Sequence, residues 1–195
     1  MGRWAPDARG RLAEAAMALY GERGFEATTV AEIAERAGLT ERTFFRYFAD
    51  KREVLFWGAE ALQEFLVAQV DAAPPERGPI ETITAALGSA ADAIFEEMRD
   101  QSRQRQDVID ANRELQEREL IKLASLAASL AEALRRRGVG DIASSLAAEA
   151  GIAAFKVAFD HWVHGDGRRT FAAGIRDSMA ELGRLAGAPN PAARR

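Results

Sequence analysis

The amino-acid sequence predicts an all-α protein, with a three-helix helix-turn-helix head followed by a helical bundle and about nine helices in total. Two observations support this prediction. Apolar residues recur at helical spacing in nearly every segment, and no segment alternates apolar and polar residues as a half-buried strand would. Glycines and paired prolines interrupt the pattern at the points where helices would have to end.

Composition and charge limit the class of protein. The 195 residues carry a formal net charge of −4 and 48% are hydrophobic, which is ordinary for a soluble globular chain. Residues 1–57 contain nine Lys or Arg and nine Asp or Glu, so the acidic excess lies further on. Cysteine is absent, which excludes disulfides and thiolate metal sites. No apolar run approaches the length of a membrane span and no signal pattern opens the chain, so we expect a cytoplasmic protein without a membrane partner.

The first predicted helix runs from Asp7 or Arg9 to Arg23 and ends at Gly24. A second predicted helix follows Thr29, with an apolar stripe formed by Val30, Ile33, Ala34 and Ala37. Thr29 and Glu32, three residues apart, have the spacing of a capping box. Gly38 can end this helix, because glycine adopts a left-handed conformation without steric cost.

The third predicted helix begins after Thr40 as its N-cap. Phe44 and Phe48, four residues apart, face the core, which leaves arginine, threonine and tyrosine side chains on the outer faces. Arginine can bond guanine edges in a bidentate way, and hydroxyl groups can bond phosphates. The pattern therefore predicts a helix that enters the major groove of DNA.

A fourth predicted helix runs from Lys51 to about Val70, with Asp50 and Glu53 as its cap. Lys51 and Arg52 in its first turn suggest a phosphate site, since free N–H groups and cations meet there. With Arg42 and Arg46 they would form a basic strip on an otherwise acidic protein, which Arg3, Arg9 and Arg11 could extend.

The remaining chain reads as a helical bundle. Residues 72–79 form a proline-rich linker, and helical spacing continues over 80–99 and 113–137. The segment 142–163 is apolar nearly all round, and a regular stripe follows from residue 171. These two helices carry more apolar surface than one subunit can easily bury. This predicts that two subunits pair through them in a two-fold four-helix interface. The predicted interface residues are Leu146, Ile152, Phe171, Ile175, Met179 and Leu182.

The stretches RLAEAAMALYGERGFEATTVAEIAERAG and AGLTERTFFRYFADKREVL resemble the tetracycline-repressor (TetR) family of bacterial regulators. The resemblance implies a DNA-binding domain at 1–50, a ligand-binding and dimerisation domain at 51–187, and a disordered tail at 188–195. It implies a homodimer on a palindromic double-stranded DNA operator, most often as a repressor released by a small-molecule effector. The implied DNA contacts are Thr28 and Thr29 on phosphate, and Thr40, Arg42, Thr43, Phe45, Arg46, Tyr47 and Lys51. Phe45 departs from the tyrosine of many members, so a phosphate-bonding hydroxyl is missing there.

The C-terminal half is also similar to the mycofactocin-regulator type of body, which implies acyl-CoA-like effectors. An apolar slot with arginines at its mouth would suit them, and the alternative is that Arg99, Arg103 and Arg105 lie on a charged surface loop. Aromatic residues at helical spacing can equally be plain core. The candidate ligand-binding residues are Phe95, Met98, Arg99, Leu123, Phe155, Phe159, His161 and Trp162.

Other functional classes find little support. His161 and His164 could hold a metal from one helix face, but no third ligand is evident, so we expect no metal and no cofactor. No glycine-rich phosphate loop and no nucleophile with a partner base is present, so no catalytic residue is predicted and an enzyme is disfavoured. The alternative function is a helical small-molecule binding module without sequence-specific DNA binding, which salt-dependent DNA binding would exclude.

Overall fold

The computed structural model describes residues 8–187, and over this range the chain is helical and contains no strand, which confirms the predicted all-α class. The chain forms two compact units. The first comprises the chain up to Ala59 together with Gln101–Leu120, and the second comprises Glu60–Asp100 and the chain from Ile121 onward. The boundaries expected at 1–50 and 51–187 divide the chain differently and stay a prediction, while the expected disordered tail at 188–195 lies outside the described residues.

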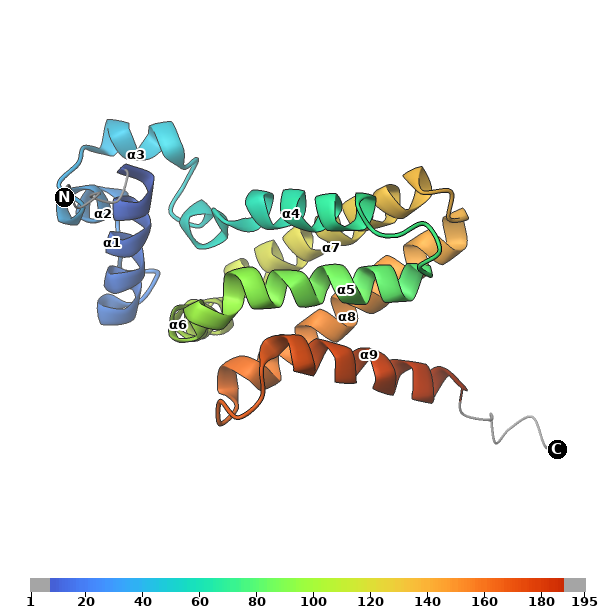
Figure 1. Ribbon diagram of the computed structural model, residues 1–195. Coiled ribbons are helices and arrows are strands. Elements are labelled where there is room, and N and C mark those ends of the chain that lie inside the picture. The colour runs from blue at the N-terminus through green and yellow to red at the C-terminus, as the bar shows by residue number, and fades with distance from the viewer. Residues whose placement is uncertain (1–7, 188–195) are drawn as a thin grey trace, which may run out of the picture. The chain divides into compact units, whose positions relative to one another are not determined.

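The first unit contains α1 (Ala8–Arg23), α2 (Val30–Arg36), α3 (Glu41–Tyr47) and the 3-10 helix η1 (Glu53–Phe56) (Figure 1). Most of α6 (Arg99–Asp110) and the first turns of α7 (Arg113–Arg136) complete it. Its core joins apolar side chains from all these elements, among them Leu12, Leu19, Ile33, Phe44, Leu55, Val108, Ile109 and Leu115. The two later helices thus supply part of the core on which α1 to α3 rest.

The continuous helix expected from Lys51 to Val70 is wrong. The chain instead forms η1, turns at Trp57 and Gly58, and continues as α4 (Ala59–Asp71). Gly58 disfavours a continuous helix, since glycine loses more conformational freedom in a helix interior than other residues. Val54, Leu55 and Phe56 are 2%, 4% and 5% exposed. Three consecutive residues point around a helix axis, so neighbouring elements must cover η1 on several sides, and Arg105 contacts Leu55 and Phe56.

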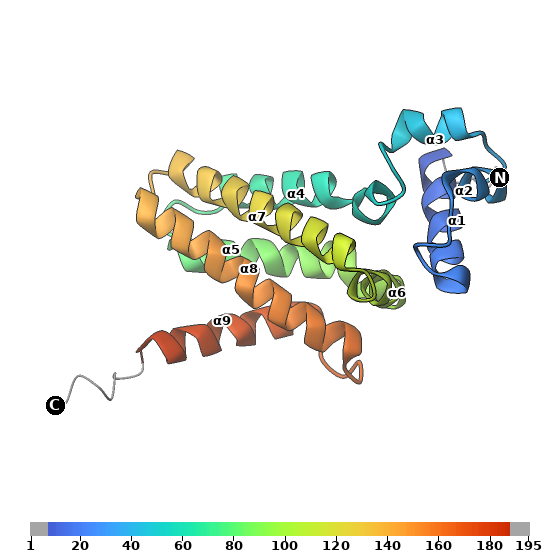
Figure 2. The same cartoon turned by 180° about the vertical axis from the view of Figure 1, so that it is seen from behind.

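The second unit is a helical bundle. Helix α5 (Pro79–Ala90) continues through a π-helical turn, η2 (Ala91–Phe95), and a 3-10 turn, η3 (Glu96–Met98), into α6. Helices α8 (Asp141–His164) and α9 (Phe171–Gly187) run as an antiparallel pair, and α5 packs against both (Figures 1 and 2). The apolar surface of α8 is therefore covered from two sides.

Glycine permits the close approach of α5 and α8. A Cβ atom added to Gly151 would lie 2.3 Å from Cγ2 of Ile83 and 3.3 Å from Cδ1 of Leu87. At Gly174 an added Cβ would lie 3.4 Å from Cβ of Ala158, so α8 and α9 also meet through small residues. Close packing of this kind makes the second unit sensitive to added volume.

Helix α8 corrects the expectation that no apolar run approaches the length of a membrane span. Among the described helices it alone is long and apolar enough to cross a bilayer, by length and composition only. In this protein 44% of its most apolar window is buried. Glu149, Lys156 and Asp160 are exposed on it, as is common for the core helix of a bundle.

Candidate DNA-binding interface

The turn between α2 and α3 is fixed by local caps, as the sequence predicts. The Thr29 hydroxyl accepts the backbone N–H of Glu32 at 3.3 Å, and the Glu32 carboxylate accepts the N–H of Thr29 at 2.8 Å. Gly38 has a φ of +65°, which an L side chain rarely adopts. Thr40 then accepts the N–H of Thr43 at 3.2 Å and begins α3. The orientation of α3 is therefore set by side chains next to it in sequence.

Helix α3 has one buried and one exposed face. Phe44 and Phe48 are 0% and 3% exposed, as predicted. The opposite faces present Thr40, Arg42, Phe45, Arg46 and Tyr47 to solvent, with Thr43 partly exposed. Two guanidinium groups, hydroxyl groups and an aromatic ring on one short helix can bond base edges and phosphates in the major groove.

Arg46 and Tyr47 form a pair on this exposed face. The Arg46 guanidinium donates a hydrogen bond to the Tyr47 hydroxyl at 3.0 Å, and its Cζ lies 4.8 Å from the centre of the tyrosine ring. Phe45 is 56% exposed and rests edge-on against Phe44, with the ring centres 5.5 Å apart. The contacts with Tyr47 restrict the positions of the Arg46 guanidinium before any ligand binds.

Thr28 cannot offer its hydroxyl to a phosphate in this conformation. Its side chain is 1% exposed and donates to the carbonyl of Gly24 at 2.8 Å. The adjacent Thr29 is exposed, and its contact with phosphate stays a prediction. The two adjacent threonines therefore differ, since the Thr28 hydroxyl is engaged internally and Thr29 is exposed to solvent.

Lys51, expected to hold a phosphate, is bound internally. Its ammonium group donates to the carbonyls of Phe25, Glu26 and Thr28 at 2.8, 3.2 and 3.0 Å. An ammonium group has three N–H donors, so all three have partners here. The Tyr20 hydroxyl donates to the carbonyl of Lys51 at 2.6 Å, and burial raises the pKa of Tyr20, which keeps the donor neutral. Lys51 therefore fixes the loop between α1 and α2.

Arg52 is paired as well. It forms ion pairs with Asp50 and with Glu114. Asp50 also accepts the backbone N–H groups of Arg52 and Glu53 at 2.8 and 3.1 Å, so these donors are not available to a phosphate. Glu53 in turn pairs with Arg118. Of the four cations expected in a basic strip, Arg42 and Arg46 are the two that the structure exposes without an internal ion pair.

The segment 101–120 is the part of this unit that sequence reasoning missed. Arg105 donates to the carbonyl of Leu55 at 2.7 Å, pairs with Glu119 at 3.1 Å, and stacks over the ring of Phe56 with 5.1 Å to its centre. Burial lowers the pKa of the Arg105 guanidinium, although the Glu119 carboxylate opposes this shift. The spacing of Val108 and Ile109 could reveal a buried helix face but not what that face packs against.

In the second unit, the candidate ligand-binding aromatics pack against one another. The rings of Phe95, Phe155, Phe159 and Trp162 each contact that of Phe171, and nine ring pairs among these residues have centre-to-centre distances between 5.1 and 6.4 Å. We call these five residues the aromatic cluster. Of the remaining candidates, Met98 and His161 are exposed and Leu123 is partly buried.

Arg99, a candidate for the mouth of an anion site, is bound to partners within the protein in this structure. Its guanidinium donates to the carbonyl of Trp162 at 2.8 Å and to that of Gly165, at the C-terminal end of α8. A cation is favourable there because the last carbonyls of a helix carry partial negative charge. Arg105 is also bound internally, and Arg103 is the one of these three arginines that is exposed.

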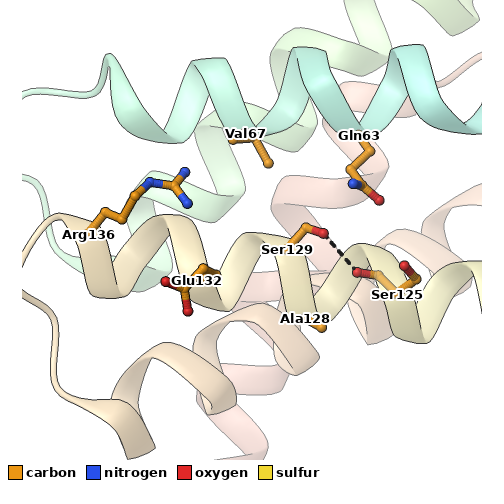
Figure 3. A pocket seen from close by; sticks show the side chains of 7 residues that line it. All are labelled: Gln63, Val67, Ser125, Ala128, Ser129, Glu132 and Arg136. Atoms are coloured by element: carbon orange, nitrogen blue, oxygen red, sulfur yellow. Dashed lines mark hydrogen bonds between the residues drawn. The ribbon is translucent and has the colours of Figure 1, made fainter.

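A different recess lies between α4 and α7 (Figure 3). It has a volume of about 450 Å³, and none of the candidate ligand-binding residues lines it. It is lined by Gln63, Val67, Ser125, Ala128, Ser129, Glu132 and Arg136, of which five have polar or charged side chains. Within residues 8–187, no group of three or more His, Asp or Glu side chains could hold a metal ion.

Four of the six predicted interface residues are buried within the subunit. Ile152, Phe171, Ile175 and Met179 are at most 8% exposed, so they belong to the bundle's own core. Leu146 and Leu182 are 65% and 37% exposed. The large apolar residues that stay exposed on α8 and α9, which we call the outer face of these helices, are Ile142, Leu146, Val157, Leu182 and Leu185.

Comparison with known families matches both units. Residues 12–56 match the family described as bacterial regulatory proteins, tetR family, and residues 77–186 match the MftR C-terminal domain. The regulator TcmR of Streptomyces glaucescens is 35% identical over 45% of this chain and 41% of that protein. The repressor KstR2 of Mycobacterium tuberculosis is 32% identical over 44% of each. The chain thus covers less than half of the length of these curated relatives.

A solved structure shows the same fold over nearly the whole chain. The transcriptional regulator FadR of Bacillus subtilis, in complex with stearoyl-CoA, aligns with a TM-score of 0.61 and 17% sequence identity. The alignment covers 89% of this chain and 96% of that one. The arrangement of helices is therefore shared by proteins of very different sequence.

Proposed function

The chain belongs to the tetR family of bacterial regulatory proteins, and we propose that it is a ligand-responsive DNA-binding regulator that represses transcription in the cytoplasm. The observation that carries the proposal is the exposed face of α3, where Arg42 and Arg46 stand on a helix held by local caps. TcmR and KstR2, to which the chain is similar, are named as a transcriptional regulator and a repressor. We assign no catalytic role to any residue.

In this proposal α3 enters the major groove, where Arg42 and Arg46 contact base edges. Thr29, Thr40, Thr43, Phe45 and Tyr47 contact the sugar-phosphate backbone around it. Because Thr28 and Lys51 are engaged internally, they act by shaping the loop that precedes α2. DNA contact therefore depends on fewer cations than the sequence suggests.

The test captures genomic fragments with the purified protein and titrates the best fragment. Arg46→Ala should weaken binding by about 10- to 100-fold, since a good bidentate base contact contributes roughly 1–3 kcal/mol. Arg113→Ala is a matched control, because Arg113 is exposed and pairs only with Glu117 in its own helix. An unchanged affinity for Arg46→Ala would remove Arg46 from the interface, and weak sequence-independent binding by the wild type would favour a ligand-binding module.

We propose that two copies associate through the outer face of α8 and α9 defined above. Five large apolar side chains that stay 37–78% exposed in one subunit support this choice. Leu146→Glu should convert a dimer to a monomer in analytical ultracentrifugation. Leu120→Glu, at a site 56% exposed on α7, should leave the dimer intact. A dimer that survives Leu146→Glu would contradict the assignment.

We place the effector site in the second unit. The aromatic cluster supports an apolar effector, which would bind by displacing ring-to-ring contacts, while the recess between α4 and α7 could receive a polar group (Figure 3). A long-chain acyl-CoA is the first class to test, since the FadR structure contains stearoyl-CoA. The effector must bind the DNA-incompetent conformation more tightly. Operator affinity unaffected by saturating stearoyl-CoA would exclude that class.

A further inference from the structure

Arg9, in the first turn of α1, holds its guanidinium between two aromatic rings of the same unit. The Arg9 Cζ lies 5.7 Å from the ring centre of Phe48 and 5.4 Å from that of Trp57. A cation over the face of an aromatic ring is attracted by the ring's electrons. Two rings at once restrict both the position and the plane of the guanidinium.

This guanidinium has no acceptor within the described part of the chain. Its Nε is buried and makes no hydrogen bond, and no carboxylate pairs with its Nη groups between residues 8 and 187. Arginine carries five N–H donors, and donors without partners are costly unless a ligand or water supplies them. Arg23 and Arg36 differ, since they pair with Glu32 and Glu22, whereas Arg11 resembles Arg9 in having a buried Nε without a hydrogen bond to the described residues.

The two rings place Arg9 beside the proposed reading helix. Phe48 is the C-cap residue of α3 and directly follows Tyr47 on the exposed face. The first turn of α1 lies next to α3 in the same compact unit (Figure 1). Lys51 and Arg52, which the sequence suggested as phosphate ligands near this point, are bound to partners within the protein. Arg9 therefore provides a positioned cation, without an acceptor among the described residues, near the point where Lys51 and Arg52 are not available to a phosphate.

We propose that Arg9 is a DNA-backbone contact, with the rings of Phe48 and Trp57 orienting its guanidinium toward a phosphate that flanks the groove occupied by α3. The planar fork of N–H groups matches two phosphate oxygens. This inference rests on the proposed DNA-binding function. It assigns to α1 a contact that carries no base specificity.

The test measures DNA affinity between 50 and 200 mM salt, for the captured fragment and for an unrelated duplex. Each phosphate contact contributes roughly 0.9 to the slope of log affinity against log salt concentration. Arg9→Gln should lower the slope by about 0.9 and reduce affinity about tenfold at low salt, equally on both duplexes. Arg9→Lys should keep the slope, because the charge remains. Arg36→Gln, at an arginine paired with Glu22 at 2.6 Å, should change neither quantity.

The readout separates a DNA contact from a structural role. If Arg9→Gln lowered affinity while its salt slope stayed at the wild-type value, Arg9 would act only by supporting the fold, and the proposal would be overturned. An unchanged affinity and slope would overturn it as well. If wild type bound the fragment, Arg46→Ala lost binding and Arg9→Gln kept it, the proposed function would stand without the Arg9 contact. If wild type bound no DNA, both the proposed function and the Arg9 contact would be contradicted.

Discussion

The stretch 29–47 in the first unit and helix α8 in the second are fixed by different kinds of interaction. In the former, each short helix begins at a threonine cap, and Gly38 supplies the left-handed turn between them. In the latter, Gly140 provides no side-chain cap, and the conformation depends on the aromatic cluster and on the close approach at Gly151. Local signals therefore build the exposed reading surface, while long-range packing builds the bundle.

If this comparison holds, the largest effect of a single truncation should come from the aromatic cluster. Phe171 is 0% exposed and contacts four other rings. Phe171→Ala should lower the free energy of unfolding by about 3–5 kcal/mol, through lost transfer energy and a cavity. Urea denaturation followed by circular dichroism measures the change. Phe45→Ala is the control, because Phe45 is 56% exposed and should cost about 0.5 kcal/mol or less.

A smaller effect should follow from removing a cap. Thr29→Ala deletes the acceptor for the Glu32 N–H and should destabilise α2 by about 1 kcal/mol. Hydrogen exchange should report faster opening at the first amides of α2. Thr84→Ala is the matched control, since Thr84 lies inside α5 and bonds only its own helix at the Ile80 carbonyl. Equal losses in the two variants would mean that the cap does not fix α2.

The smallest effect concerns pH. Burial alone would raise the pKa of Asp50, but hydrogen bonds from Arg52 and from the N–H of Glu53 lower it below its ordinary value. A carboxyl group whose pKa is lowered by folding stabilises the folded state at pH values above its unfolded-state pKa. This stabilisation is lost as the pH falls through the folded-state pKa. Asp50→Asn should therefore be slightly less stable than wild type at pH 7, and the two should converge as the pH falls below about 4. A constant difference across this range would contradict the shift.

The comparison also explains which features the sequence could reveal. Helices α1 to α3, both threonine caps and the turn at Gly38 depend largely on neighbours within four residues, and these predictions are confirmed. Helical spacing also predicted correctly that Phe44 is buried and Arg46 is exposed. The partners of Lys51 and Arg99 lie 23 to 66 residues away in the chain. A cation can bind a carbonyl of its own protein as well as a phosphate, and sequence spacing does not distinguish these outcomes.

The same limit applies to apolar residues. Ile152 and Leu146 both belong to a helix that is apolar nearly all round, yet one is 5% and the other 65% exposed. The difference is set by where α5 and α9 pack on α8, which periodicity within α8 cannot show. Likewise, nothing in the pattern of residues 101–120 indicates that they join the same compact unit as α1 to α3.

The most direct test of the proposed function is a hydroxyl-radical footprint of the wild-type protein on the captured DNA fragment. If two copies insert their α3 helices into successive major grooves, the footprint should show two equivalent protected patches centred about 34 Å, or one helical turn, apart on a palindromic sequence. Arg46→Ala should remove both patches together. Protection of a single patch, or uniform protection without a symmetric centre, would contradict recognition by a two-fold pair of helix-turn-helix units.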